Sequence, residues 1–214
     1  MSVPNILATR YASAAMRSIW TPENKIRAER RLWLTVMEAQ ADLGVSFGGD
    51  DPEQVLADYQ AVLDDVDLDS IAEREAITRH DVKARIEEFN ALAGHEHIHK
   101  GMTSRDLTEN IEQMQVLESL RLVRDKMVAT LNQLSRLAAQ FSDQAIAGRS
   151  HNVAAQVTTL GKRFATAIDE MLVAWDHVNE LIERYPARGI KGPMGTAQDM
   201  LDLLGGDESK LDDL

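Results

Sequence analysis

Apolar residues recur every three or four positions along most of the chain, the spacing of amphipathic α-helices. The first clear case follows Thr21, which can cap a helix, and Pro22, which suits the first helical position. The apolar residues that share one face are Leu32, Val36, Ala39 and Leu43. We therefore expect a helix ending near Gly44, then an acidic loop and shorter helices up to Asn90.

A much longer helix is expected later, because residues 102–147 contain neither glycine nor proline. Their apolar positions form the seam of a helix that packs along its length. This seam consists of Leu120, Val123, Met127, Leu131, Leu134, Ala138 and Phe141. Such a helix would be roughly 60–70 Å long at 1.5 Å per residue.

A second long helix is expected to begin at His151 and to end near Pro186. Its seam consists of Leu160, Phe164, Ile168, Met171, Trp175, Val178 and Ile182. Two long striped helices with a short connection form an antiparallel hairpin. This hairpin needs further helices to cover its remaining apolar surface, either from its own chain or from copies.

No repeat and no strand alternation is visible, so the pattern predicts an all-α fold. We expect a small N-terminal helical domain over residues 1–101 and the start of a long-helix bundle over 102–214. The last segment, DMLDLLGGDESKLDDL, stops within a new helical pattern. We therefore expect a truncated bundle, the N-terminal portion of a longer protein.

Composition narrows the function classes. Hydrophobic residues make up 44% and charged residues 27%, which is typical of soluble globular proteins. A net charge of −12 argues against a nucleic-acid binder, although a small phosphorylated ligand needs only a few cationic or hydroxyl groups. The sequence shows neither a secretory signal nor a membrane span, so we expect a cytoplasmic protein. The absence of cysteine excludes disulfides and Cys-ligated zinc.

His151 is a candidate general acid or base, because the pKa of histidine lies near working pH. Its spacing fits equally a capping or packing histidine at a corner between helices. Downstream polar residues can line a polar pocket or face solvent. These residues are Gln156, Thr158, Thr159 and Lys162.

The stretch HEHIHKGMTSRDLTEN places His95 and His99 four residues apart, as metal ligands on one helix face would be. No further ligand completes a familiar pattern, so we expect no metal. Thr103 or Ser104 is expected to cap a helix, and the free N–H groups at its start suit an anion. A plain N-cap is the alternative.

Three further motifs offer polar groups. TRHDV places Arg79, His80 and Asp81 at a junction between helices, and TRYAS places Arg10 beside Tyr11 in an expected extended segment. Both motifs also fit solvated turns. RGIKGPMGTAQ is a glycine-spaced turn that matches no standard phosphate loop.

The order of these motifs resembles the adenylosuccinate lyase family of the fumarase/aspartase superfamily. The motifs are TRYAS, TRHDV, IHKGMTSRDLTEN, GRSHNVAAQVTTLGKR and RGIKGPMGTAQDML. The resemblance implies an all-helical homotetramer with active sites shared between subunits and without metal or organic cofactor. It also implies purine biosynthesis: elimination of fumarate from adenylosuccinate, giving AMP, and the same cleavage of the succinylated aminoimidazole carboxamide ribotide.

By this resemblance, His151 matches the general acid and His80 a second active-site histidine that orients the substrate. Thr103 and Ser104 match the pair that contacts the succinyl carboxylates. The other matches are Arg79 and Asp81 beside His80, His99 near the ligand, Arg10 and Tyr11 near the phosphate, and Gln156 and Thr158 in the block of His151.

Two features depart from the family pattern. NVAAQVTT lacks the proline that many relatives carry before the paired threonines, and the signature loop S-S-x-M-P-x-K-x-N-P is absent from the sequence. That loop carries the serine base and a substrate-binding lysine, so we expect the base to lie outside this chain and the chain alone to be inactive. Argininosuccinate lyase or fumarase, and a non-catalytic helical assembly module, remain alternatives.

Overall fold

The computed structural model describes residues 5–214, which form two compact units. The first unit runs up to Gln115 and resumes at Ala187–Leu214, and the second is Val116–Pro186. The division therefore falls inside a long helix, and the expected domain boundary between residues 101 and 102 stays a prediction. No helix among the described residues is long and apolar enough to cross a membrane.

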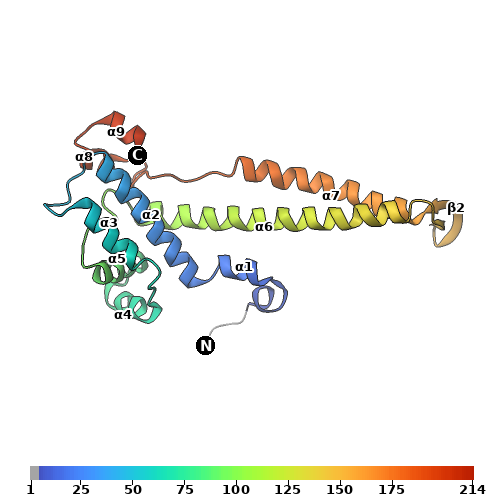
Figure 1. The fold of residues 1–214 in the computed structure, drawn as a ribbon, viewed down its shortest axis with the longest axis horizontal. Helices are drawn as coiled ribbons and strands as arrows, with labels where there is room; N and C mark the ends of the chain where they lie inside the picture. The colour runs from blue at the N-terminus through green and yellow to red at the C-terminus, as the bar shows by residue number, and fades with distance from the viewer. Residues whose placement is uncertain (1–4) are drawn as a thin grey trace. The chain divides into compact units, whose positions relative to one another are not determined.

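Helices build the first unit (Figure 1). They are η1 (a π-helical turn, Leu7–Tyr11), α1 (Ala14–Ile19), α2 (Pro22–Asp42), α3 (Pro52–Ala61), α4 (Leu68–Thr78), α5 (Asp81–Ala93), the start of α6 (Ser104–Gln140), α8 (Gln198–Leu203) and α9 (Glu208–Asp213). The helix expected over residues 21–44 is confirmed by α2. Thr21 accepts a hydrogen bond from the Asn24 N–H at 3.2 Å, and Gly44 follows the helix with a φ of 84°.

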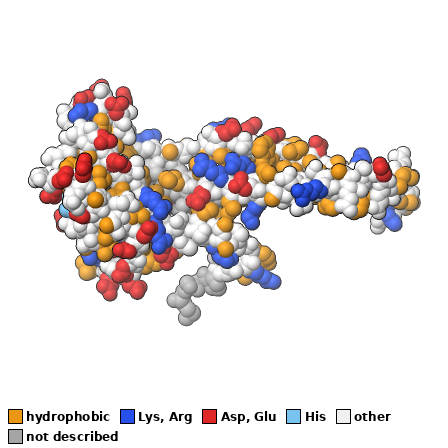
Figure 2. Space-filling model, viewed as in Figure 1, with side chains coloured by type: hydrophobic (Ala, Val, Ile, Leu, Met, Phe, Trp, Pro, Cys, Tyr) orange, Lys and Arg blue, Asp and Glu red, His pale blue; other side chains and the backbone are white. Residues whose placement is uncertain are grey.

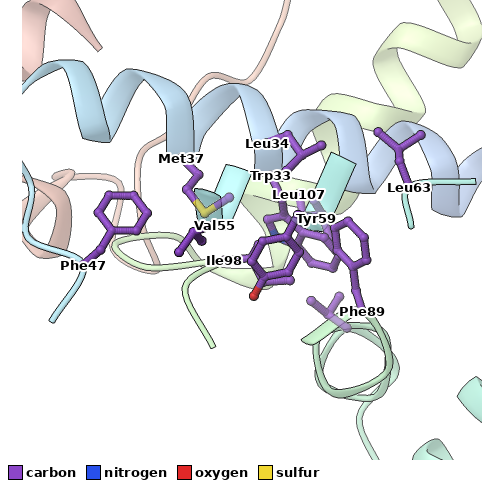
Figure 3. Packing of buried hydrophobic residues seen from close by; sticks show 11 residues of the cluster. Trp33, Leu34, Met37, Phe47, Val55, Tyr59, Leu63, Phe89, Ile98 and Leu107 are labelled. Atoms are coloured by element: carbon purple, nitrogen blue, oxygen red, sulfur yellow. The ribbon is translucent and has the colours of Figure 1, made fainter. Parts of the chain in front are cut away.

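The core of the first unit lies between α2, α3 and α5 (Figure 3). Trp33 and Met37 of α2, Tyr59 of α3 and Phe89 of α5 are almost completely buried there. The face of α2 that the sequence predicted to be apolar lies beside these core residues. Its Val36 packs against α8. Each face of α2 therefore has its own partners, and the helix is covered on more than one side.

The second unit corrects the sequence expectation of two helices joined at His151. Helix α6 ends at Gln140, and an antiparallel pair of strands follows, β1 (Ala145–Ser150) and β2 (Val153–Thr159). Helix α7 (Leu160–Glu183) begins only after the strands. His151 and Asn152 form the two-residue turn, with φ values of 50° and 67°, as type I′ hairpin turns require. The expected helix over residues 102–147 is thus shorter, and His151 does not start a helix.

Within the second unit, α7 runs back beside the last turns of α6 (Figure 1). Gly161 fixes this approach, since a Cβ there would lie 2.4 Å from the Ala138 carbonyl oxygen. The two predicted seams are only half-buried, apart from Val123, which is exposed. Hydrophobic side chains also remain exposed elsewhere on the unit (Figure 2), at Val128, Val153, Val157, Leu172, Val173 and Leu181.

Candidate functional site

A tight turn between α4 and α5 positions His80. Arg79 takes the left-handed conformation, with a φ of 54°, and this reverses the chain after Thr78. His80 then caps α5: its Nδ1 accepts a hydrogen bond from the Lys83 N–H at 3.2 Å. Because Nδ1 accepts, the proton of the neutral ring lies on Nε2, and Nε2 is left to point away from the helix.

The start of α6 meets His80 at this point. Ser104 Oγ lies 3.3 Å from His80 Nε2, so the structure brings together two residues that the sequence placed in one site. With the ring proton on Nε2, His80 donates to Ser104 Oγ, which leaves the serine O–H free to donate to a ligand. The backbone N–H of the adjacent Thr103 donates to Asp106 Oδ2 at 2.9 Å, which means that this particular N–H group is not free for an anion.

His99 lies just before this turn and is held as a neutral donor. Trp33 Nε1 donates to His99 Nδ1 at 2.9 Å, so the ring proton lies on Nε2. Burial lowers the pKa of His99 to about 4, while the charge of Asp106 acts against this shift. At neutral pH the side chain can donate a hydrogen bond without carrying a charge.

Asp81 is tied to the buried part of the first unit through Arg85. Arg85 bonds Asp81 Oδ2 at 2.9 Å and Glu29 Oε1 at 2.8 Å. Burial raises the pKa of Glu29, and the nearby Arg85 acts in the opposite direction. Asp81 directly follows His80, so its ion pair with Arg85 also anchors the turn that carries His80.

Together these groups suit a carboxylate ligand. Two histidines carry Nε2 protons, Thr103 and Ser104 supply hydroxyls, and Arg79 adds a cation at the same turn. Preorganised donors of this kind stabilise negative charge that develops during a reaction. The sequence analysis did not name Trp33 or Arg85. Trp33 could have been found, because a tryptophan in a buried stripe needs a hydrogen-bond acceptor for its indole N–H.

The remaining predicted residues belong to other elements of the chain. Gln156 and Thr158 line a surface hollow of about 620 Å³ in the second unit, with three cations at its wall: Arg149, Lys162 and Arg163. Gln156 and Thr158 belong to strand β2, not to a helix as the sequence suggested. His151 lies at the exposed hairpin turn.

Arg10 and Tyr11 belong to η1 and not to an extended segment. Both are exposed, and the Arg10 guanidinium lies 5.6 Å from the centre of the Tyr11 ring. Their side chains are accessible to a ligand, and the cation and ring already contact one another.

One group of the described residues has the composition of a metal site. Asp50, His95 and His97 offer ligand atoms within 4.8 Å of one another. Hydrogen bonds already occupy these rings: His95 Nε2 bonds Asp58 and His97 Nε2 bonds Asp50, each at 2.8 Å. The Lys100 ammonium lies 2.8 Å from His97 Nδ1 and repels a second cation. The pair suggested by spacing, His95 and His99, does not form, because His99 faces Trp33.

Comparisons with known proteins show which family the chain is similar to. Residues 9–200 match the family described as Lyase. The adenylosuccinate lyases of Saccharomyces cerevisiae and Schizosaccharomyces pombe are 33% and 34% identical to the chain, over 97% of its length. The chain spans only 43% of either relative.

A solved structure shows the same fold. The fumarate lyase from Mesorhizobium sp. BNC1 superposes with a TM-score of 0.76 at 22% identity, covering 94% of this chain and 48% of that one. The fold is therefore the helical fold of such lyases, here with a two-stranded hairpin between its long helices. With nearly its whole length matched, the chain belongs to the lyase family.

Proposed function

We propose that this chain is the N-terminal portion of an adenylosuccinate lyase, which releases fumarate from adenylosuccinate to give AMP. The same enzyme would cleave the succinylated aminoimidazole carboxamide ribotide of purine biosynthesis in the cytoplasm. The observation that carries the proposal is the meeting of His80 with Ser104 at 3.3 Å. The similarity to curated adenylosuccinate lyases supports it.

The residues of the first unit fit the requirements of this elimination. Removal of the proton next to a succinyl carboxylate builds a dianion, which needs hydrogen-bond donors already in place. Ser104, Thr103 and the Nε2 proton of His99 are such donors, and the Nε2 proton of His80 holds Ser104 Oγ in place. A neutral His99 suits this role, because donation does not require it to gain or lose a proton.

His151 is proposed as the general acid that protonates the departing nitrogen of the purine side. A histidine suits that step because its ordinary pKa allows it to carry a proton near neutral pH. The hairpin turn presents its side chain to solvent or to a partner. The base is proposed to lie in the signature loop, which this sequence does not contain.

We further propose that the complete protein is a homotetramer. Gly161 is the one buried residue of the second unit, so the apolar seams of α6 and α7 are left half-covered. Long helices with uncovered apolar stripes are stable when further helices pack on them. Copies of the chain would supply those helices and bring further residues to each active site.

Turnover assays test the proposal. The complete lyase is expected to convert adenylosuccinate to AMP and fumarate, followed by the change in absorbance, while argininosuccinate is not cleaved. The 214-residue chain alone is expected to be inactive and to regain activity when mixed with the missing portion. Cleavage of argininosuccinate in preference, or no cleavage of any succinylated substrate by the complete protein, would refute it.

A further inference from the structure

Asp106 is a buried carboxylate with a full set of donors. Its Oδ2 accepts from the backbone N–H groups of Thr103 and Gly192 at 2.9 and 3.0 Å. Its Oδ1 accepts from Arg188 Nε and from the Lys191 N–H, both at 3.1 Å. Burial acts to raise the pKa of Asp106, but these hydrogen bonds outweigh burial and hold the pKa below its ordinary value.

The donors on one side of Asp106 belong to a single segment, residues 188–192, which we call the strap. The strap follows α7 in the sequence but lies along the first turns of α6. Asn110 exchanges two hydrogen bonds with Gly189, each at 3.0 Å, and the Arg188 N–H donates to Gln113 at 2.6 Å. Arg188 also pairs with Glu109 at 2.9 Å.

The same carboxylate oxygen joins the strap to the candidate site. Oδ2 of Asp106 holds Gly192 from the strap and Thr103 from the start of α6. Ser104, which faces His80, is the next residue. A second contact supports the turn from behind: a Cβ at Gly101 would lie 2.9 Å from the Met200 side chain of α8, so α8 packs closely on this loop.

We propose that Asp106 is a positioning residue, whose carboxylate holds the turn of Thr103 and Ser104 against the strap and so fixes these two donors for the substrate carboxylates. The proposal rests on the proposed function. Asp106 is completely buried and acts through Thr103 rather than by touching substrate. Its negative charge would repel a succinyl group, and the paired Arg188 offsets this repulsion.

The variant Asp106→Asn separates the effect of the Asp106 hydrogen bonds on the position of Thr103 and Ser104 from the effect of its negative charge. The amide keeps the shape of the side chain but turns one acceptor oxygen into a donor. Depending on how the amide is oriented, either the N–H groups of Thr103 and Gly192 or those of Arg188 and Lys191 then meet another N–H. Loss of the negative charge by itself favours an anionic substrate. A higher KM for adenylosuccinate in this variant therefore reports displaced donors and not electrostatics.

In the complete lyase we expect Asp106→Asn to raise KM and to lower kcat/KM by about a hundredfold, the scale of a misplacement near 1 Å. The matched control is Glu88→Gln, which weakens the buried pair with Arg30 (2.6 Å) away from the turn. This control is expected to lower the melting temperature while KM stays unchanged. Kinetic constants of Asp106→Asn within twofold of the wild type, or an equal rise in KM in Glu88→Gln, would overturn the proposal.

Hydrogen exchange measured on the 214-residue chain tests the contact independently of turnover. The Thr103, Lys191 and Gly192 amides are expected to exchange at least about tenfold faster in Asp106→Asn, since each loses a buried charged acceptor. Unchanged exchange at all three amides would overturn the proposal. Absence of turnover by the wild-type complete protein would instead refute the proposed function, and the exchange result would still decide the role of Asp106.

A second variant covers the case in which Asp106→Asn does not fold. Asn110→Ala loosens the strap at Gly189 without altering any charge and leaves the Asp106 carboxylate in place. We expect faster exchange in the strap together with a rise of about tenfold in KM. Faster exchange in the strap with an unchanged KM would show that the strap does not position the turn, and would overturn the proposal.

Discussion

The half-buried histidine of the first unit, His99, makes a quantitative prediction about acid stability. His99 has an ordinary pKa of 6.5, which burial lowers to about 4 in the folded chain. Between these values the unfolded chain binds a proton at His99 and the folded chain does not. Stability from this residue is therefore complete above pH 6.5 and is lost as the pH falls through 4. The difference of about 2.5 units between the two pKa values corresponds to about 3 kcal/mol of folding stability.

Urea unfolding at several pH values measures this loss, and His99→Asn is the comparison. The asparagine oxygen can still accept from the Trp33 indole, but the side chain does not titrate. Glu29 contributes in the opposite direction, because its raised pKa makes the folded chain bind the extra proton. Both proteins retain Glu29, so the difference between their curves isolates His99.

Between pH 7 and pH 4 the wild type is expected to lose about 3 kcal/mol more than His99→Asn. The slope should be concentrated between pH 6.5 and 4. Parallel curves, differing by less than about 0.5 kcal/mol over this range, would refute the reasoning that burial keeps His99 neutral.

Three further substitutions test other parts of the structure. Trp33→Phe removes the donor to His99 Nδ1 and should raise the pKa of His99 toward 6.5 by roughly one unit, as followed by NMR titration; an unchanged pKa contradicts that hydrogen bond. Gly161→Ala places a Cβ against the backbone at Ala138 and should destabilise the chain by about 3 kcal/mol in urea unfolding, whereas a neutral effect would mean that the helices can separate there. His151→Ala in the complete lyase should lower kcat at least roughly a hundredfold with unchanged circular dichroism, and a near-normal kcat would remove His151 from the acid role.

Helices with local signals were predictable from the sequence. Thr21 and Pro22 mark the start of α2 within a few residues, and the junction at His80 follows from a short polar interruption. Such signals depend on neighbours along the chain: a cap bonds an N–H three residues away. Sequence reasoning located these elements because their causes are local.

The hairpin shows where this reasoning fails. The stretch after His151 contains alanines that suit a helix, and the seam residues on both sides favoured two helices joined at His151. The opposing signals were weaker: Val153 and Val157 are β-branched, and Asn152 tolerates a positive φ. Residues 153–159 form a strand because they pair with β1. Pairing between strands has no fixed spacing in the sequence, so the local pattern did not reveal it.

The sequence motifs name residues of the candidate site but not the residues that hold them in place. His80, Thr103 and Ser104 were named from the motifs that carry them. Asp106 is not among those residues, and no pattern near it in the sequence indicates what its carboxylate holds. Its partners Arg188 and Gly192 lie 82 and 86 positions later, beyond the reach of any local pattern.

The strap also brings together the two points at which the chain leaves and re-enters the first unit. The chain leaves the first unit after Gln115 and re-enters it at Ala187, and the hydrogen bond from Arg188 to Gln113 closes that excursion at 2.6 Å. The hairpin unit is thus an insert whose exit and entry points are already adjacent. A short linker can replace it, and hairpins of other lengths or sequences can be exchanged at the same two points. The first unit and the hairpin unit are therefore parts of the chain that evolution or design can vary separately.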